Sequence, residues 1–404
     1  MTADRLTRLL GPRLADIEAR GLYRRRRVVE AAGPGERLVV DGRSCVGFCS
    51  NDYLGLAQDP RVGEAFAKAA RATGAGSGAS HLVTGHHREH HRLEEALAAF
   101  TGRERALAFS TGYMANLGLA RALVGPGDAV FEDRLNHASL LDAGRLAGAE
   151  FVRFGHASAA ALEAALADHP RGLRLVLTDG VFSMDGDLAP LPDIVGACER
   201  HDALLAVDDA HGLGVIGPTG RGIVEHFGLG AAEVPALVGT LGKAFGSFGA
   251  FVAGGEALVE YLIQRARTYI YTTALPPAVA AATRRALEIA QDEPWRRERV
   301  LAHAARFRRL AAAAGIEVLP SGTPIQPVLL GEPRRAVAAS AALLDRGYLV
   351  TAIRPPTVPP GTSRLRITFS AAHQDSDVDR LVAALSDVLA TLPVEPAQVP
   401  AHHG

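Results

Sequence analysis

The chain has 404 residues, 48% of them hydrophobic, which is enough apolar surface for a large core and a smaller companion domain. Its 43 lysines and arginines are balanced by 44 acidic residues, the formal net charge is −1, and apart from one N-terminal cluster the basic residues are scattered. This charge pattern argues against nucleic acid and against a membrane surface as partners, and it favours a small-molecule ligand.

The sequence contains no segment of the kind that enters or crosses a membrane. No run of about 18 apolar residues occurs, and the first residues carry arginines and an aspartate without an apolar signal region. We therefore expect a cytoplasmic protein. Cys45, Cys49 and Cys198 form neither a CxxC pair nor a zinc spacing, so we expect all three to be reduced thiols in the core.

Residues 1–50 are expected to form an N-terminal arm. Apolar residues recur at helical spacing from residue 4 to about 22, and Gly21 ends this pattern before the adjacent arginines Arg24 to Arg27. Such a basic run is typical of a solvated or dimer-contacting stretch; alternatively, one arginine binds a substrate carboxylate through its planar guanidinium. Strand-like runs flank Asp41-Gly42, which predicts a small two-stranded hairpin.

A glycine-rich loop and a group of histidines follow. Helical patterns cover residues 60–72 and 86–100, and the loop at 74–80 has alternate glycines. No strand precedes this loop, so we expect flexible backbone near a ligand rather than a dinucleotide site. Histidines within residues 86–91 have spacings that could hold a metal on a helix face, but no carboxylate or cysteine nearby completes the set. We expect histidines on the helix surface near a cleft, and no metal.

A phosphate site is indicated where the strand at 106–109 meets a helix that runs to Val124. Small polar residues and glycine lie between them, from Ser110 to Asn116. Free N–H groups at a helix N-terminus and the helix dipole both favour an anion, so Gly112 and Tyr113 are candidates for phosphate binding.

Strands and helices alternate from residue 129 to 253, which predicts an α/β fold with a large, mainly parallel sheet covered on both faces. Asp208 ends one apolar run, His211 follows it, and Lys243 lies between glycines after the next strand. Catalytic groups gather at such strand ends. Together these residues suggest a pyridoxal phosphate site, in which the lysine forms a Schiff base and a buried carboxylate keeps the pyridine nitrogen protonated.

Two other interpretations of Lys243 compete with this one. A phosphate-binding P-loop would need glycine in place of Leu237 and a hydroxyl residue in place of Ala244, so it is excluded. A solvated loop lysine stays open on this pattern alone. His137, between a strand and a helix, is either a capping or core group or a ring that stacks on the pyridine.

From Trp295 the pattern changes to a compact α+β unit. Arg364 and Arg366 lie two apart on one predicted strand and hence on one face, for which a solvated edge is the competing interpretation. We divide the chain into an arm and hairpin at 1–50, a large cofactor-binding domain at 51–290, a small α+β domain at 291–392 and a flexible tail at 393–404.

Five motifs, in order along the chain, identify a family. They are Asn51 to Leu56, Asn136 to Ser139, Val181 to Gly186, Val207 to Gly212 and Gly239 to Lys243. Together they resemble the α-oxoamine synthases, which are fold-type-I pyridoxal-phosphate transferases, and the resemblance covers about residues 5–390. It implies a homodimer with active sites at the subunit interface.

The resemblance also implies roles for individual side chains. Lys243 would hold the cofactor, Asp208 would pair with the pyridine nitrogen, and His137 would stack on the ring. The phenolic oxygen and the phosphate would be bound by the remaining cofactor residues: His211, Ser183, Gly112, Tyr113, Thr240 and, from a partner subunit, Thr272 or Thr273.

Within the family, three segments favour the member that joins L-alanine to a pimeloyl thioester, of CoA or an acyl-carrier protein, in biotin synthesis. They are residues 76–85, 325–328 and 352–362. Arg366 would then bind the alanine carboxylate, Arg24 the far carboxylate of the pimeloyl chain, and Thr357 and Asn51 would line the substrate site.

Other features resemble glycine C-acetyltransferase. These are Asp179, the run Leu241 to Ala244 and the stretch Gly21 to Tyr23, and they leave the acyl chain open. A remote alternative is a non-catalytic subunit that keeps the fold, but such a subunit would be expected to lose Lys243.

Overall fold

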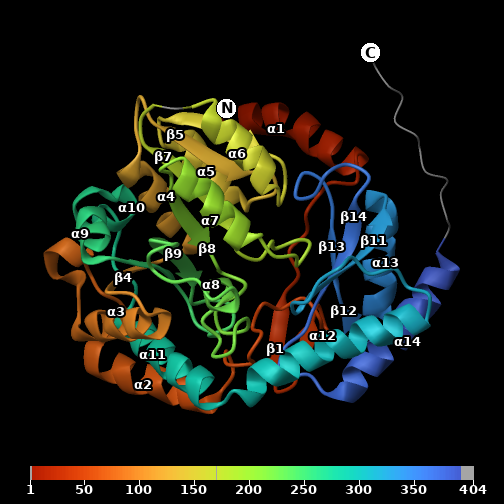
Figure 1. Cartoon of the computed structure of the whole chain (residues 1–404). Helices are drawn as coiled ribbons and strands as arrows, with labels where there is room; N and C mark the ends of the chain where they lie inside the picture. Colours follow the sequence, from red (N-terminus) through yellow and green to blue (C-terminus); the bar gives the residue numbers. More distant parts are fainter. Residues whose placement is uncertain (1, 170, 393–404) are drawn as a thin grey trace. The chain divides into compact units, whose positions relative to one another are not determined.

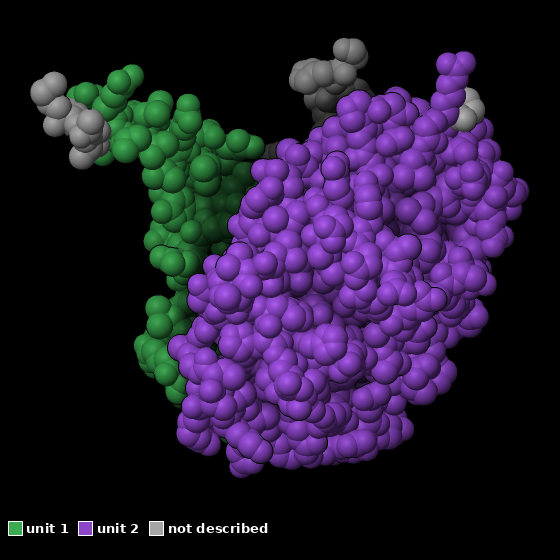
Figure 2. Space-filling model, turned by 90° about the vertical axis from the view of Figure 1, so that its left-hand side faces the viewer, with its two compact units in different colours: residues 1–50, 302–404 green, residues 51–301 purple. Residues whose placement is uncertain are grey.

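A computed structural model describes residues 2–169 and 171–392, and the chain divides into two compact units, coloured separately in Figure 2. The large unit is Asn51–Leu301, and the small unit combines the first 50 residues with the chain from Ala302 onward. The tail expected at 393–404 lies outside the described residues.

The large unit is built on a seven-stranded sheet with the order β4-β10-β9-β8-β7-β5-β6. Figure 1 labels β4, β5, β7, β8 and β9 of this sheet. Neighbouring strands are parallel except at β10, which is antiparallel to both β4 and β9, so the mainly parallel sheet expected from the sequence is confirmed. The reversal has a physical cause, because only the short segment 241–249 joins β9 to β10, and a parallel crossover needs a dozen or more residues. The strands are β4 (Arg105–Phe109), β5 (Ala129–Asp133), β6 (Glu150–Phe154), β7 (Arg174–Asp179), β8 (Leu204–Asp208), β9 (Ala236–Thr240) and β10 (Ala250–Gly254).

Helices cover this sheet, and its central strands are buried along nearly their whole length. One side of the core packs Phe109, Leu119 and Val252 together with Tyr269. Strands that are apolar throughout require cover on both faces, which explains why their sequences do not alternate. The helices are α2 (Pro60–Thr73), α3 (Arg88–Thr101), α4 (Gly112–Leu123), α5 (Ala138–Leu146), α6 (Ala159–Ala167), α7 (Leu191–Arg200), α8 (Ile223–His226), α9 (Glu256–Arg265), α10 (Arg267–Ile270) and α11 (Pro277–Asp292).

The histidine-rich segment differs from the expectation. Helix α3 begins at Arg88 rather than His86, and a π-helical turn, His81–Gly85, precedes it. His90 is fully buried, so the expected placement of all these histidines on the helix surface is wrong. Helical spacing shows which residues share a face, but the burial of that face depends on what packs against it.

The small unit contains two sheets. In the first, β1 (Val29–Gly33), β2 (Arg37–Val40) and β3 (Arg43–Gly47) are joined by β12 (Tyr348–Leu349), which pairs parallel to β3. The expected two-stranded hairpin is therefore part of a larger sheet that recruits a strand from a distant part of the sequence.

The second sheet of the small unit has the order β11-β14-β13, with bounds Ile325–Gly331, Ser363–Thr368 and Thr351–Ile353. Because β14 is central, Arg364 and Arg366 are only 4% and 7% exposed, and the interpretation as a solvated edge is wrong. The helices associated with this unit are α1 (Thr2–Ala19), α12 (Trp295–Ala313), whose first residues belong to the large unit, α13 (Pro333–Asp345) and α14 (Asp375–Thr391).

Two further expectations can be compared with the structure. Cys45 and Cys198 are buried free thiols as expected, whereas Cys49 is only partly buried, so it is not a full core residue. Over the described ranges, none of the helices combines the length and the apolar character needed to span a bilayer.

Candidate active site

The carboxyl ends of neighbouring strands of the large unit meet at one cavity. Asp179 ends β7, Asp208 ends β8 and Thr240 ends β9, and the N-terminus of α4 adds backbone N–H groups. The cavity has a volume of about 180 Å³ and is lined by Gly112, Tyr113, His137, Ser139, Asp179, Ser183, Asp208, Ala210, His211, Thr240 and Lys243.

Lys243 stands at the end of a chain of hydrogen-bonded groups. Its Nζ lies 2.9 Å from Nε2 of His211, and the other ring nitrogen of His211 lies 2.7 Å from the hydroxyl of Tyr53. Tyr53 donates its own proton to Oδ1 of Asn51 at 3.2 Å, so its oxygen accepts from His211 Nδ1–H. This order leaves the lone pair of Nε2 facing Lys243, and His211 therefore orients the amine.

Asp208 is held by two N–H donors. Nδ2 of Asn116 donates to its Oδ2 at 2.7 Å, and the backbone N–H of Ala210 donates to its Oδ1 at 3.1 Å. Asp208 is only 6% exposed, and these two bonds give each of its carboxylate oxygens a donor. The second contact of Asn116, to the hydroxyl of Ser139 at 2.8 Å, fixes the direction of its amide.

His137 is fixed at the start of α5. Its backbone N–H donates to Oδ2 of Asp179 at 2.6 Å, and its Nδ1 lies 2.8 Å from the hydroxyl of Ser139. Burial, together with the charge of Lys243, lowers the pKa of His137 although Asp208 opposes the shift. The ring is therefore neutral at physiological pH, which suits a planar stacking group better than a cation.

Two further carboxyl groups support this part of the sheet. Burial, reinforced by the charge of Asp208, raises the pKa of Asp179 well above its usual range. Burial likewise raises the pKa of Asp209, whose Oδ2 accepts the N–H of Ile223 at 2.7 Å. A Cβ at Gly222 would lie 1.7 Å from that same oxygen, so glycine is required there.

The N-terminus of α4 has the geometry of an anion site. The side chain of Thr111 caps the helix by accepting the N–H of Met114 at 3.1 Å, and the first N–H groups of a helix have no partner inside it. A Cβ at Gly112 would meet no atom within 4 Å, so the space beside this backbone is open. The site can therefore accommodate a phosphate group.

Some of the expected site residues lie elsewhere. Within the large unit, the hydroxyl of Thr272 donates to the carbonyl of Thr268 at 2.7 Å, Thr273 forms a bridge with Ser80, and Asn51 is connected to the cavity through Tyr53. The remaining substrate residues, Arg24, Thr357 and Arg366, belong to the small unit, so their relation to Lys243 remains a prediction.

Sequence reasoning assigned no role to several residues that hold the site together. Asn116 is a buried polar residue inside a helical pattern, and Tyr53 is a fully buried tyrosine. Both stand within runs that were singled out for other reasons, and buried polar side chains are normally hydrogen-bonded. Asn116 could have been recognised by its polarity on an otherwise apolar helix face, whereas no pattern indicates which side chain Tyr53 contacts.

Comparison with known proteins agrees with this geometry. The family model Aminotransferase class I and II matches residues 43–385. The chain is 62% identical over 376 residues to 8-amino-7-oxononanoate synthase of Methylococcus capsulatus (strain ATCC 33009 / NCIMB 11132 / Bath), covering 93% of this chain and 97% of that protein. The corresponding protein of Nitrosococcus oceani (strain ATCC 19707 / BCRC 17464 / JCM 30415 / NCIMB 11848 / C-107) is 61% identical over 377 residues, which are 93% of this chain and 100% of the relative.

Solved structures of related enzymes are also similar to this chain. Serine palmitoyltransferase from S. paucimobilis with a bound PLP–myriocin aldimine has a TM-score of 0.90 and 31% identity, covering 95% of this chain and 97% of that chain. The 8-amino-7-oxononanoate synthase of Francisella tularensis has a TM-score of 0.75 and 30% identity, covering 86% and 98%. The fold class and the resemblance expected from the five motifs are thus confirmed. The chain belongs to the class I and II aminotransferase family, and within it to the fold-type-I pyridoxal-phosphate enzymes of the 8-amino-7-oxononanoate synthase group.

Proposed function

We propose that this protein is an acyltransferase that condenses L-alanine with a pimeloyl thioester, with loss of CO2 and release of the free thiol, to give 8-amino-7-oxononanoate for biotin synthesis. The observation that carries the proposal is the position of Lys243, whose amine faces His211 in a cavity that also contains Asp208. The relatives at 62% and 61% identity are named for this activity, and the chain matches them over nearly their whole length.

The residues lining the cavity fit pyridoxal phosphate as cofactor. When bound, the cofactor supplies an electron sink for charge that develops on the amino acid. Asp208 would hold its ring nitrogen, Lys243 its carbonyl carbon, and the flat neutral ring of His137 would stack on it. The other contacts would come from His211 and Ser183 to the phenolic oxygen, from Gly112, Tyr113 and Thr240 to the phosphate, and from Thr272 or Thr273 of a second copy.

Hydrogen bonds within the large unit support two of these roles. The N–H groups of Asn116 and Ala210 donate to the two carboxylate oxygens of Asp208 and fix its position, which suits a partner for the ring nitrogen. Lys243 Nζ is the base that removes the proton from Cα of alanine, and His211 holds that amine in the cavity.

Substrate contacts from the small unit complete the proposal. Arg366 would bind the alanine carboxylate, and its burial to 7% exposure on a central strand supports a role beyond surface charge. Arg24 would bind the distal carboxylate of the pimeloyl group. Thr357 and Asn51 would line the path of the substrate, and the acyl donor would be a thioester of CoA or of an acyl-carrier protein.

We also propose a homodimer that acts in the cytoplasm. Tyr271 is 68% exposed directly beside Thr272 and Thr273, which supports a surface covered by a second copy. Measurement of the molecular mass in solution tests this part, since a monomer at working concentration would contradict it.

The lysine assignment has a matched control, because the sequence contains only two lysines, Lys68 and Lys243. Lys68 is on α2, whereas Lys243 lines the cavity. Reduction of the holoenzyme with borohydride should fix the cofactor covalently in wild type and in Lys68→Ala, but not in Lys243→Ala. Covalent cofactor in Lys243→Ala would show that the assignment is wrong.

The acyl group is tested separately, because Asp179 and the run Leu241 to Ala244 favour glycine C-acetyltransferase as second candidate. Thiol release should be measured with alanine, glycine or serine against pimeloyl-, acetyl- or succinyl-CoA. We expect alanine with pimeloyl-CoA to be preferred. Arg24→Ala should lose the preference for a carboxylate-ended acyl chain, while Arg25→Ala, whose side chain pairs with Glu18 at 3.0 Å, should keep it.

A further inference from the structure

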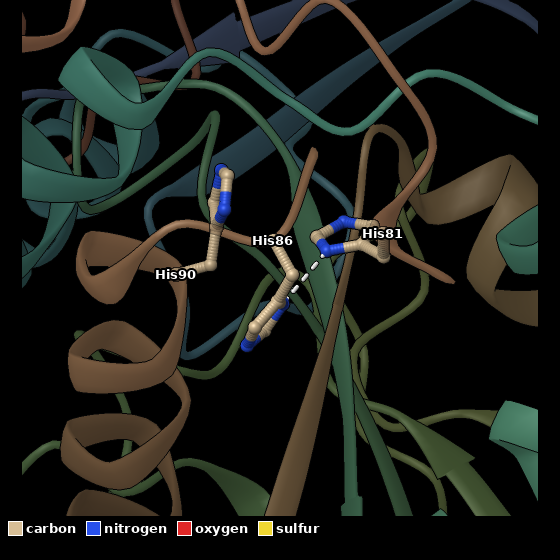
Figure 3. A group of neighbouring side chains, drawn as sticks. All are labelled: His81, His86 and His90. Atoms are coloured by element: carbon tan, nitrogen blue, oxygen red, sulfur yellow. Dashed lines mark hydrogen bonds between the residues drawn. The ribbon is translucent and has the colours of Figure 1, made fainter. Parts of the chain in front are cut away.

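The histidines before and within α3 divide into two kinds. The Nδ1 atoms of His81 and His86 lie 2.9 Å apart. Figure 3 shows this contact, with His90 beside the pair. His90 has both nitrogens engaged with backbone, since Nε2–H donates to the carbonyl of Leu275 at 2.7 Å and Nδ1 accepts the N–H of His87 at 2.9 Å. His90 therefore holds the fold together and has no lone pair for an ion.

His86, His91 and Glu94 form a separate group on the outer side of this segment. One ring nitrogen of each histidine and one carboxylate oxygen of Glu94 all lie within 4.8 Å of one another. His91 and Glu94 are three residues apart on α3 and so share a face of the helix. The sequence argument against a metal, that no carboxylate completes the set, overlooked Glu94, which lies one helical turn further on.

Glu94 is fixed in position and directed at His86. Its side chain is 13% exposed, its Oε1 accepts the backbone N–H of Ala108 on β4 at 2.9 Å, and its Oε2 lies 4.0 Å from Nε2 of His86. A separation of 4.0 Å is too long for a hydrogen bond. A carboxylate removed from water is stabilised by a nearby positive charge, and an ion between Oε2 and Nε2 would supply it.

We propose that His86, His91 and Glu94 bind one divalent transition-metal ion of the zinc type. Two imidazoles and one carboxylate are a ligand set that such ions accept, with open positions left for water. Ligands on one tetrahedral ion are roughly 3.3 Å apart, given metal–ligand bonds of about 2.0–2.2 Å. The ligand atoms of this group lie within 4.8 Å of one another, so the widest pair must approach by no more than about 1.5 Å. His86 and His91 are partly or largely exposed at 33% and 65%, so their side chains are free to make this adjustment and the ion has a path of entry.

His81 is placed to hydrogen-bond His86, a ligand of the proposed ion, without binding the ion itself. If Nδ1–H of His86 donates to Nδ1 of His81, the lone pair of His86 is on Nε2, the atom that faces Glu94. His81 is itself held by stacking on Tyr269, with ring centroids 4.7 Å apart. The ion would thus connect α3 to the segment that precedes it.

The experiment uses the full-length holoenzyme, treated with a chelator and then titrated with Co²⁺ while the visible absorption of the bound ion is recorded. Wild type should bind one ion per chain. His86→Ala, His91→Ala and Glu94→Gln should each weaken binding at least about tenfold, the loss that even outer partners of metal ligands produce. Glu94→Gln retains an oxygen to accept the N–H of Ala108, so it should stay folded.

Two variants serve as matched controls. Glu95 is the neighbouring carboxylate, with Oε1 3.3 Å from Nε2 of His91, and His226 is an exposed histidine on α8. Glu95→Gln and His226→Ala should bind Co²⁺ as wild type does. The proposal is overturned if wild type shows no saturable binding of one ion, or if Glu94→Gln retains wild-type affinity. It is equally overturned if Glu95→Gln rather than Glu94→Gln loses the ion, or if binding persists in all variants, as it would for an ion held by the cofactor.

Discussion

Asn116 provides the sharpest test of how the cavity works. The residue is 2% exposed, its amide donates to Asp208 at 2.7 Å, and we argue that this bond holds the carboxylate in place. Asn116→Leu removes the donor while nearly conserving the volume of the side chain. A hydrogen bond to a charged group contributes about 1.5–3 kcal/mol. If the whole of it acts on the reacting state, kcat/KM should fall about 10- to 150-fold, at about 1.4 kcal/mol per factor of ten.

The assay is thiol release with alanine and pimeloyl-CoA, on enzyme whose cofactor content and denaturation midpoint have been measured. Ser139→Ala is the comparison, because it leaves Asp208 its donor and removes the hydroxyl that lies 2.8 Å from both the Asn116 amide and Nδ1 of His137. Each of these bonds joins neutral groups and contributes about 0.5–1.5 kcal/mol, and neither acts on Asp208, so this variant should lose less kcat/KM than Asn116→Leu. A folded Asn116→Leu enzyme within twofold of wild type would refute the reasoning, as would a larger loss in Ser139→Ala.

Two further predictions concern stability. Burial alone would lower the pKa of His156, but ion pairs with Asp133 and Asp187, at 3.0 and 2.9 Å, raise it to about 10. The stability that these ion pairs add to the folded state is complete below the unfolded pKa of about 6.5, and it is lost as the pH rises through 10. Urea midpoints of wild type should therefore fall more steeply than those of His156→Gln between pH 6.5 and 10, and parallel curves would contradict this. Gly222→Ala, whose Cβ would lie 1.7 Å from a buried carboxylate oxygen at a φ of 88°, should lower the free energy of unfolding by about 2–4 kcal/mol. Gly228→Ala, with φ of 67° and open space, should cost only about 1–2 kcal/mol, and equal losses would contradict the steric argument.

The convergence of the site could be predicted because parallel strands end at one edge of a sheet. Asp208, His211 and Lys243 were each assigned to the end of a strand or the turn after it, and the structure brings all three to one cavity. Their supporting partners could not be predicted in the same way. Asn116 reaches Asp208 from the interior of a helix and Tyr53 reaches His211 from a distant loop, so both contacts depend on packing that no local pattern contains.

The same limit explains the errors in the fold. Periodicity reports how apolar one element is, but not which neighbour it pairs with. In the sheet β11-β14-β13 of the small unit, β14 is the central strand. Arg366 on β14 is therefore buried, although a charged residue on a strand suggested an edge strand. His90 looked like a surface residue of a polar helix, yet the carbonyl of Leu275 lies over it and satisfies its ring. In each case a long-range contact decided the burial of a polar side chain.

The buried acidic residues at this edge of the sheet give the cavity a physical reason to favour a cation. Asp179, Asp208 and Asp209 lie at or next to two neighbouring strand ends, all nearly or fully buried. Burial and the charge of Asp208 raise the pKa values of Asp179 and Asp209, and Asp208 itself has two N–H donors. A cation placed beside Asp208 would relieve the repulsion that disfavours ionisation of the other two carboxyl groups. Binding of a protonated ring nitrogen at Asp208, as proposed, would therefore be coupled to the whole acidic group.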